Sequence, residues 1–99
     1  MKKRIYISGP ITNDPDYMNK FNSAEIDLID EGYTSIINPA FVAKSLPDDF
    51  THENYMQVAL AELRQCEAVF MLKGWKESVG ACREYQEAVD RGMEIVYQK

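Results

Sequence analysis

Residues 73–85 combine side chains and turns that are typical of a ligand-binding site. An apolar run, 68–72, ends directly before this segment, and two glycines, a tryptophan and a serine lead into a stretch with helical spacing. Glu84 follows in the first turn of that helix or just beyond it. In parallel α/β proteins, ligands bind where the carboxyl end of a strand passes into the next helix. Glu84 is therefore the first candidate for a residue that performs chemistry.

The helical position of Glu84 indicates what kind of chemistry it suits. At about 100° per residue, Glu84 lies on the flank of the apolar stripe that Ala81, Tyr85 and Ala88 form. A carboxylate there is partly desolvated and is stabilised by the helix N-terminus. We expect this combination to keep Glu84 ionised at neutral pH, as a nucleophile must be. The alternative is structural, because acidic residues favour first helical turns for the dipole alone.

Other candidate residues lie where predicted strands end. Tyr6 is placed to orient Glu84, although a strand tyrosine more often packs in the core. Ser78 can hold an anion or a hydroxyl together with nearby backbone N–H groups, or simply cap the helix. Trp75 can stack on a base or cover an oligomer contact. The remaining residues that we expect to contact a ligand are Ser8, Gly9, Pro10, Asn38, Gly74 and Gly80.

Short β-rich runs alternate with helical segments along the chain. The run 68–72 lacks polar alternation, which is typical of a strand buried on both faces. The first helix is predicted to begin with Asp14 as N-cap and Pro15 at the first helical position. Residues 40–51 stay open between a loop and one turn of helix. The predicted strands are 4–8, 34–37, 68–72 and 94–97, and the later helices begin near residues 51 and 80.

Helical spacing also predicts which residues point inward. The expected inward residues are Phe21, Ala24, Leu28 and Ile29 in the first helix, Met56, Ala59, Leu60, Leu63 and Cys66 in the second, and Ala81, Tyr85, Ala88 and Val89 in the third.

This alternation predicts one α/β domain over residues 1–99. We expect a three-layer, flavodoxin-like parallel sheet with strand order 2-1-3-4 and three main helices. Right-handed crossovers place the first helix on one face and the other two on the opposite face. The loops that begin at Ser8 and Lys73 then face each other across one crevice. Half of the first-helix face would be bare, so we expect a homodimer or a larger homo-oligomer packed through that side.

Composition argues against several classes of protein. A net charge of −5 argues against a non-specific nucleic-acid binder, but not against a nucleotide ligand. Cys66, Cys82 and His52 lack the spacing of a zinc site, so we expect no metal and no cofactor, and we place His52 at the surface. No apolar run approaches the roughly 20 residues that span a bilayer. The basic start is not followed by a signal-peptide core, which indicates a cytoplasmic protein.

Four motifs resemble those of a known group of enzymes, and the resemblance covers nearly the whole chain. They are I-Y-I-S-G-P at 5–10, N-P at 38–39, C-E-A-V-F-M-L-K-G-W at 66–75 and S-x-G-A-x-x-E-Y at 78–85. Together they resemble a small family of phage and bacterial domains. That family is similar to the nucleoside 2-deoxyribosyltransferases and to the deoxynucleoside monophosphate N-glycosidases.

The resemblance implies a flavodoxin-like fold and attack by a glutamate on the anomeric carbon of a deoxyribose. Glu84 matches that nucleophile, and Tyr6 matches the strand tyrosine that positions it. The covalent deoxyribosyl-enzyme would pass to another base (transfer) or to water (hydrolysis), with net retention of configuration. The implied partner is a small-molecule nucleoside or nucleotide.

Two positions depart from the pattern. The transferases have an aspartate six residues before the nucleophile, and this chain has Ser78 at that position. The monophosphate glycosidases also have a serine there, which fits phosphate binding. The relatives also carry an acid in the second helix that helps to protonate the departing base, and this chain has Ala59. Its loss costs about 10²–10⁴-fold if nothing replaces it. Glu53, Glu62 and Glu77 are acidic candidates for the replacement. The alternative function is a nucleotide-binding module that keeps the pocket without the reaction.

Overall fold

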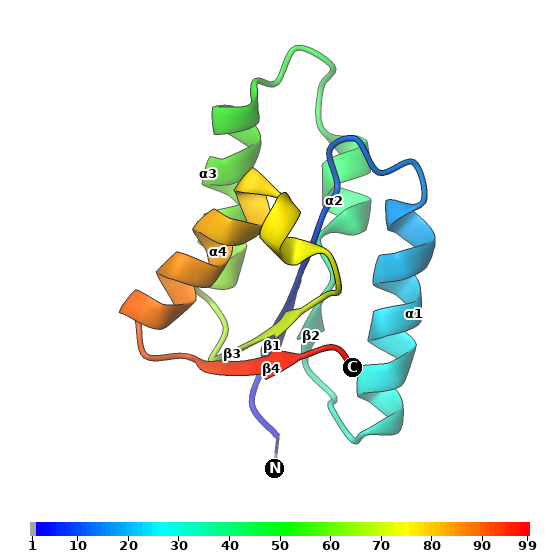
Figure 1. Cartoon of the computed structure of the whole chain (residues 1–99), viewed down its shortest axis with the longest axis vertical. Helices are drawn as coiled ribbons and strands as arrows, with labels where there is room; N and C mark the ends of the chain where they lie inside the picture. The colour runs from blue at the N-terminus through cyan, green and yellow to red at the C-terminus, as the bar shows by residue number, and fades with distance from the viewer. Residues whose placement is uncertain (1) are drawn as a thin grey trace.

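A central parallel sheet organises the molecule, and the computed structural model describes residues 2–99 of the chain. The sheet has four strands in the order β2-β1-β3-β4, and every neighbouring pair is parallel (Figure 1). This is the flavodoxin-like arrangement that the sequence predicts. The strands are β1 (Ile5–Ser8), β2 (Ile36–Ile37), β3 (Ala68–Met71) and β4 (Glu94–Tyr97).

Helices cover both faces of the sheet, with α1 on one side and α3 and α4 on the other (Figure 1). Three of the four α-helices are long, as predicted. The undecided region after β2 contains the fourth, a short helix. The helices are α1 (Tyr17–Asp30), α2 (Ala40–Ser45), α3 (His52–Leu63) and α4 (Val79–Asp90), and a 3-10 helix, η1 (Trp75–Glu77), precedes α4.

The central strands β1 and β3 are buried on both faces, which explains their apolar sequences. Alternate side chains of β1 enter different cores. Ile5 and Ile7 pack against α1, whereas Tyr6 packs on the opposite face with residues of α3 and α4. The same alternation places Ser8 on the face of Tyr6.

Side-chain caps fix where the two helices beside Tyr6 begin. Thr51 caps α3: its hydroxyl accepts a hydrogen bond from the Asn54 N–H at 3.0 Å, and the Asn54 side chain accepts one from the Thr51 N–H. Ser78 caps α4, with its hydroxyl accepting a hydrogen bond from the Ala81 N–H at 3.2 Å. Both caps provide hydrogen-bond acceptors for backbone N–H groups at the helix starts, which would otherwise lack partners.

The structure corrects two boundaries. Helix α1 begins at Tyr17 rather than at Pro15, because the Asp14 carboxylate accepts a hydrogen bond from the Asp16 N–H at 3.0 Å and closes a turn before the helix. Strand β2 contains only Ile36 and Ile37, which are the residues that pair with β1.

Most inward predictions are confirmed, including all five in the second predicted helix. The predictions that Ile29 and Val89 point inward are wrong, because these residues are 54% and 45% exposed. In each case the buried stripe is narrower than the predicted one: the buried residues are Phe21, Ala24 and Leu28 in α1 and Ala81, Glu84 and Ala88 in α4. Exposed Ile26 and Ile29 leave apolar surface on α1, the side where we expect a second copy. Within residues 2–99 no helix has the length and apolar character needed to cross a membrane.

Candidate functional site

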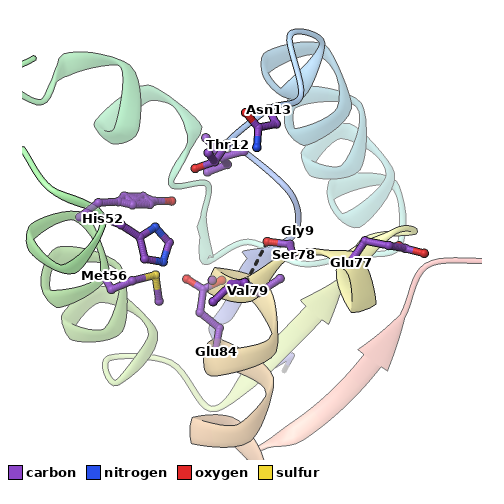
Figure 2. A pocket seen from close by; sticks show the side chains of 13 residues that line it. Gly9, Thr12, Asn13, His52, Met56, Glu77, Ser78, Val79 and Glu84 are labelled. Carbon is purple, nitrogen blue, oxygen red and sulfur yellow. Dashed lines mark hydrogen bonds between the residues drawn. The ribbon is translucent and has the colours of Figure 1, made fainter.

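A cavity of about 390 Å³ lies at the carboxyl-end edge of the sheet (Figure 2). Its walls come from the loop after β1, the first turns of α3, and the segment that leads into α4. The lining residues are Gly9, Ile11, Thr12, Asn13, His52, Tyr55, Met56, Glu77, Ser78, Val79, Gly80, Ala81 and Glu84. The switch point between β1 and β3 therefore does contain a pocket.

Glu84 is the buried carboxylate of this cavity, and its side chain is 5% exposed. The Tyr6 hydroxyl donates a hydrogen bond to Glu84 Oε2 at 2.6 Å, and the Ser8 hydroxyl donates one to Oε1 at 2.6 Å. Hydroxyl–carboxylate bonds of about 2.5–2.7 Å are among the strong hydrogen bonds of proteins. Tyr6 and Ser8 stand two residues apart on one strand, so a single face of β1 fixes both carboxylate oxygens.

Burial dominates the electrostatics of Glu84. Desolvation raises the pKa of its carboxyl group to about 7, although the hydrogen bonds from Ser8 and Tyr6 lower it. The expectation that Glu84 is fully ionised at neutral pH is therefore wrong. Glu84 lies beyond the first turn of α4, which begins at Val79, and the helix dipole acts mainly within that turn. The carboxyl group is poised between its two protonation states near pH 7.

Tyr6 remains a hydrogen-bond donor over the whole range in which Glu84 titrates. Burial, together with the charge of Glu84, holds the pKa of its hydroxyl well above the ordinary value. The Tyr6 side chain thus supplies a fixed donor and is not a proton shuttle at neutral pH.

Of the other residues predicted to contact a ligand, Gly9, Ser78 and Gly80 line the cavity. Ser8 reaches it only through Glu84. Gly9 lets the loop after β1 pack closely on Leu72: a β-carbon at Gly9 would lie 2.8 Å from Leu72 Cβ. A β-carbon at Gly80 would lie 3.1 Å from the sulfur of Met56.

The remaining four predicted residues lie away from this cavity. Pro10 lines a separate hollow beside α1. Asn38 donates its side-chain hydrogen bonds to residues of α1. Gly74 and Trp75 line another hollow next to β4, and the Trp75 ring stacks on Tyr85 with 4.5 Å between centroids. The turn after β3 therefore places Gly74 and Trp75 beside the end of β4 rather than beside Glu84.

The sequence interpretation missed the contribution of α3. His52, Tyr55 and Met56 all line the cavity, and Figure 2 shows the His52 imidazole next to the Glu84 carboxylate. His52 is exposed, as predicted, but it is exposed toward the cavity. One signal was available: α3, like α4, begins at the carboxyl-end edge of the sheet, so its first residues share that edge with Glu84.

The structure contains no candidate metal centre among residues 2–99, where no three His, Cys, Asp or Glu side chains gather. Cys66 and Cys82 are both free thiols. Burial raises the pKa of the Cys66 thiol to about 11, which makes it unreactive at neutral pH.

Comparison with known proteins identifies the family of the chain. A family model described as a domain of unknown function, DUF4406, matches residues 3–97. Searches of curated proteins and of solved structures gave no significant match. Because the model matches nearly the whole length, the chain belongs to the DUF4406 family.

Proposed function

We propose that this domain cleaves the N-glycosidic bond of a 2′-deoxynucleoside or its 5′-monophosphate, with Glu84 as the nucleophile. The observation that carries the proposal is one buried carboxylate, held through both oxygens by two hydroxyl groups, in a cavity of about 390 Å³. That volume falls within the range of small-molecule sites, about 300–1,000 Å³. The motif resemblance to nucleoside 2-deoxyribosyltransferases and deoxynucleoside monophosphate N-glycosidases supports the same reaction.

The hydrogen bonds to Glu84 suit a nucleophile. An ionised carboxylate has about four lone-pair sites, so Tyr6 and Ser8 leave lone pairs free for attack. The two hydroxyl donors hold the carboxylate in one orientation and favour its ionised form. The bond from Glu84 to the anomeric carbon forms as the carbon–nitrogen bond breaks, and the electron pair leaves with the base. Water or a second base then displaces Glu84 and restores the carboxylate.

The rest of the lining suits a nucleoside. Ile11, Met56 and Val79 provide apolar surface for a base or a sugar ring, and Thr12 and Asn13 provide hydrogen-bonding groups. The Ser78 hydroxyl accepts a hydrogen bond from the backbone and keeps its own hydrogen available for a phosphate or hydroxyl oxygen.

One observation favours the alternative, a binding module without the reaction. Ala59 is 1% exposed and offers no proton donor where the enzymes that the motifs resemble have an acid. A domain with this pocket and no other acid would hold a nucleotide without cleaving it at a useful rate.

Base release separates the two functions. The protein is incubated with deoxynucleosides and their 5′-monophosphates, with and without an acceptor base, and free base is followed by chromatography. We expect release by the unchanged chain, loss of release in Glu84→Gln, and retention in Glu87→Gln, the same change on α4 outside the cavity. A deoxyribosyl adduct should also appear in the intact-protein mass spectrum. Equal release by Glu84→Gln would contradict the proposed nucleophile.

Thermal stabilisation by ligand tests the binding alternative and the role of Ser78. Stabilisation by a deoxynucleoside monophosphate without base release would support the binding module. A Ser78→Ala variant should lose part of the stabilisation by the monophosphate and keep that by the nucleoside. Identical stabilisation of both variants by the monophosphate would exclude a phosphate contact at Ser78.

A further inference from the structure

His52 occupies the first position of α3 and faces the cavity. A β-carbon placed on Gly80 would lie 3.6 Å from His52 Cε1, so the imidazole reaches across to the first turn of α4. Gly80 and Glu84 are four residues apart and share one face of α4. Figure 2 shows the imidazole close to the Glu84 carboxylate, with both groups at the edge of the same space. A ligand bound in that space would lie against both groups.

We propose that His52 is the general acid that protonates the departing base. This inference rests on the proposed function, because it assigns the second half of the same reaction. His52 and Ala59 are seven residues apart on α3 and therefore share a face of that helix. The imidazole would thus supply, from two turns nearer the helix start, the proton that Ala59 cannot.

The three acidic candidates fit this role less well. Glu53 forms an ion pair with Arg83 at 2.9 Å, and this pair lowers the pKa of its carboxyl group. Burial raises the pKa of Glu62, but Glu62 is not part of the cavity lining. Glu77 lines the cavity, yet Figure 2 shows its carboxylate directed away from Glu84.

The other ionisable groups of the lining cannot replace His52. Burial and the nearby Glu84 charge hold the pKa of Tyr55 well above its ordinary value, so it is a poor proton donor at neutral pH. Lysine and arginine do not occur among the lining residues. The titratable groups that line the same hollows as His52 are Glu84 from α4, Tyr55 from its own helix, Glu77 from η1, Lys44 from α2 and Asp48 from the loop before α3. The charge of His52 also acts on its neighbour Glu53.

The proposed step balances as follows. Glu84 attacks the anomeric carbon, the carbon–nitrogen bond breaks, and the electron pair goes to the base. The His52 imidazolium gives its proton to a ring nitrogen of that base and becomes neutral. Water then attacks the anomeric carbon, its proton returns to His52, and the ester bond to Glu84 breaks. General acid catalysis of this kind contributes about 10²–10⁴-fold.

Two substrates that differ in their need for a proton test the role of His52. The base of 2′-deoxyadenosine 5′-monophosphate leaves well only when it is protonated. The base of 7-methyl-2′-deoxyguanosine already carries the positive charge and leaves neutral. We expect His52→Gln to release adenine about 10²–10⁴-fold more slowly than the unchanged chain. It should release 7-methylguanine at nearly the unchanged rate.

Two further measurements separate catalysis from structure. His52→Gln should unfold at the same temperature as the unchanged chain, and so should Gln57→Ala, an exposed α3 control that keeps both activities. The dependence of adenine release on pH should differ between His52→Gln and the unchanged chain, as expected when a general acid is removed.

The outcomes distinguish this inference from the proposed function. Equal loss on both substrates would overturn the acid role, and so would no loss on either. Release of 7-methylguanine alone by the unchanged chain would show that Glu84 acts without an internal acid, and would overturn only the role of His52. Failure of the unchanged chain on both substrates would refute the proposed function and with it this inference.

Discussion

Replacing Glu84 by glutamine should stabilise the folded domain above neutral pH and change it little in acid. Glutamine has the shape of the protonated carboxyl group and never ionises, whereas the buried Glu84 must ionise as the pH rises. The Tyr6 and Ser8 hydroxyls can donate to the amide oxygen and accept from the amide nitrogen, so both contacts survive in some orientation. The variant therefore isolates the cost of ionising a buried group.

The magnitude follows from the pKa shift. Burial raises the pKa of Glu84 from 4.5 to about 7, so the folded state binds its proton more tightly than the unfolded state does. The resulting stabilisation is complete below about pH 4.5 and is lost as the pH rises to about 7. The full difference amounts to about 3 kcal/mol. Glu84→Gln keeps this stabilisation at every pH.

Urea unfolding at a series of pH values measures the effect. The free energy of unfolding of Glu84→Gln, minus that of the unchanged chain, should rise through this window and then stay constant. Glu87→Gln is the matched control on the same helix. The Arg64 guanidinium lowers the pKa of Glu87, so this variant should lose stability as the pH rises. A difference for Glu84→Gln that does not vary with pH would refute the reasoning.

Four other predictions test the site and its supports. Gly9→Ala should lower the free energy of unfolding by about 1–3 kcal/mol in urea, because the added carbon would lie 2.8 Å from the Leu72 side chain. An unchanged free energy would show that the loop moves to make room for the carbon. Tyr6→Phe removes a hydrogen bond that lowers the pKa of Glu84, so carbon NMR of the Glu84 carboxyl group should show titration at a higher pH. A lower pKa of Glu84 in this variant would contradict the prediction. Thr51→Ala removes the cap of α3 and should lower the free energy of unfolding by about 1 kcal/mol, again measured in urea. An unchanged free energy would mean that packing alone fixes where α3 begins. The homodimer predicted from the sequence should give twice the chain mass in light scattering, and a monomer mass at all concentrations would rule it out.

Much of the fold could be predicted from the sequence because local patterns and topology point to the same answer. Buried parallel strands have uninterrupted apolar runs, and Ala68–Met71 is such a run. The flavodoxin-like strand order 2-1-3-4 places the loop after Ser8 near the start of α4, and the crossover rule gives the face on which each helix lies. Glu84 was reachable by this route because its helix directly follows the central strand.

The features that could not be predicted from the sequence depend on contacts between segments that are distant along the chain. His52 lies in a different element from Glu84, and nothing in its immediate neighbours shows that its ring points into a cavity. The full burial of Glu84 also depends on packing of α3 against α4, so its raised pKa was not visible from helical position alone. Trp75 was misplaced for a similar reason: the partner that fixes its ring is Tyr85, one helical segment later.

The parallel sheet also gives the two ends of the domain different surroundings. All four strands run toward the edge that holds the cavity, so β1 begins at the opposite edge and β4 finishes at the cavity edge (Figure 1). A protein fused ahead of β1 would therefore lie on the side of the domain opposite the cavity mouth. One fused after β4 would leave the domain on the same side as that mouth and could crowd it. For surface immobilisation or fluorescent labelling, attachment ahead of β1 leaves ligand access open.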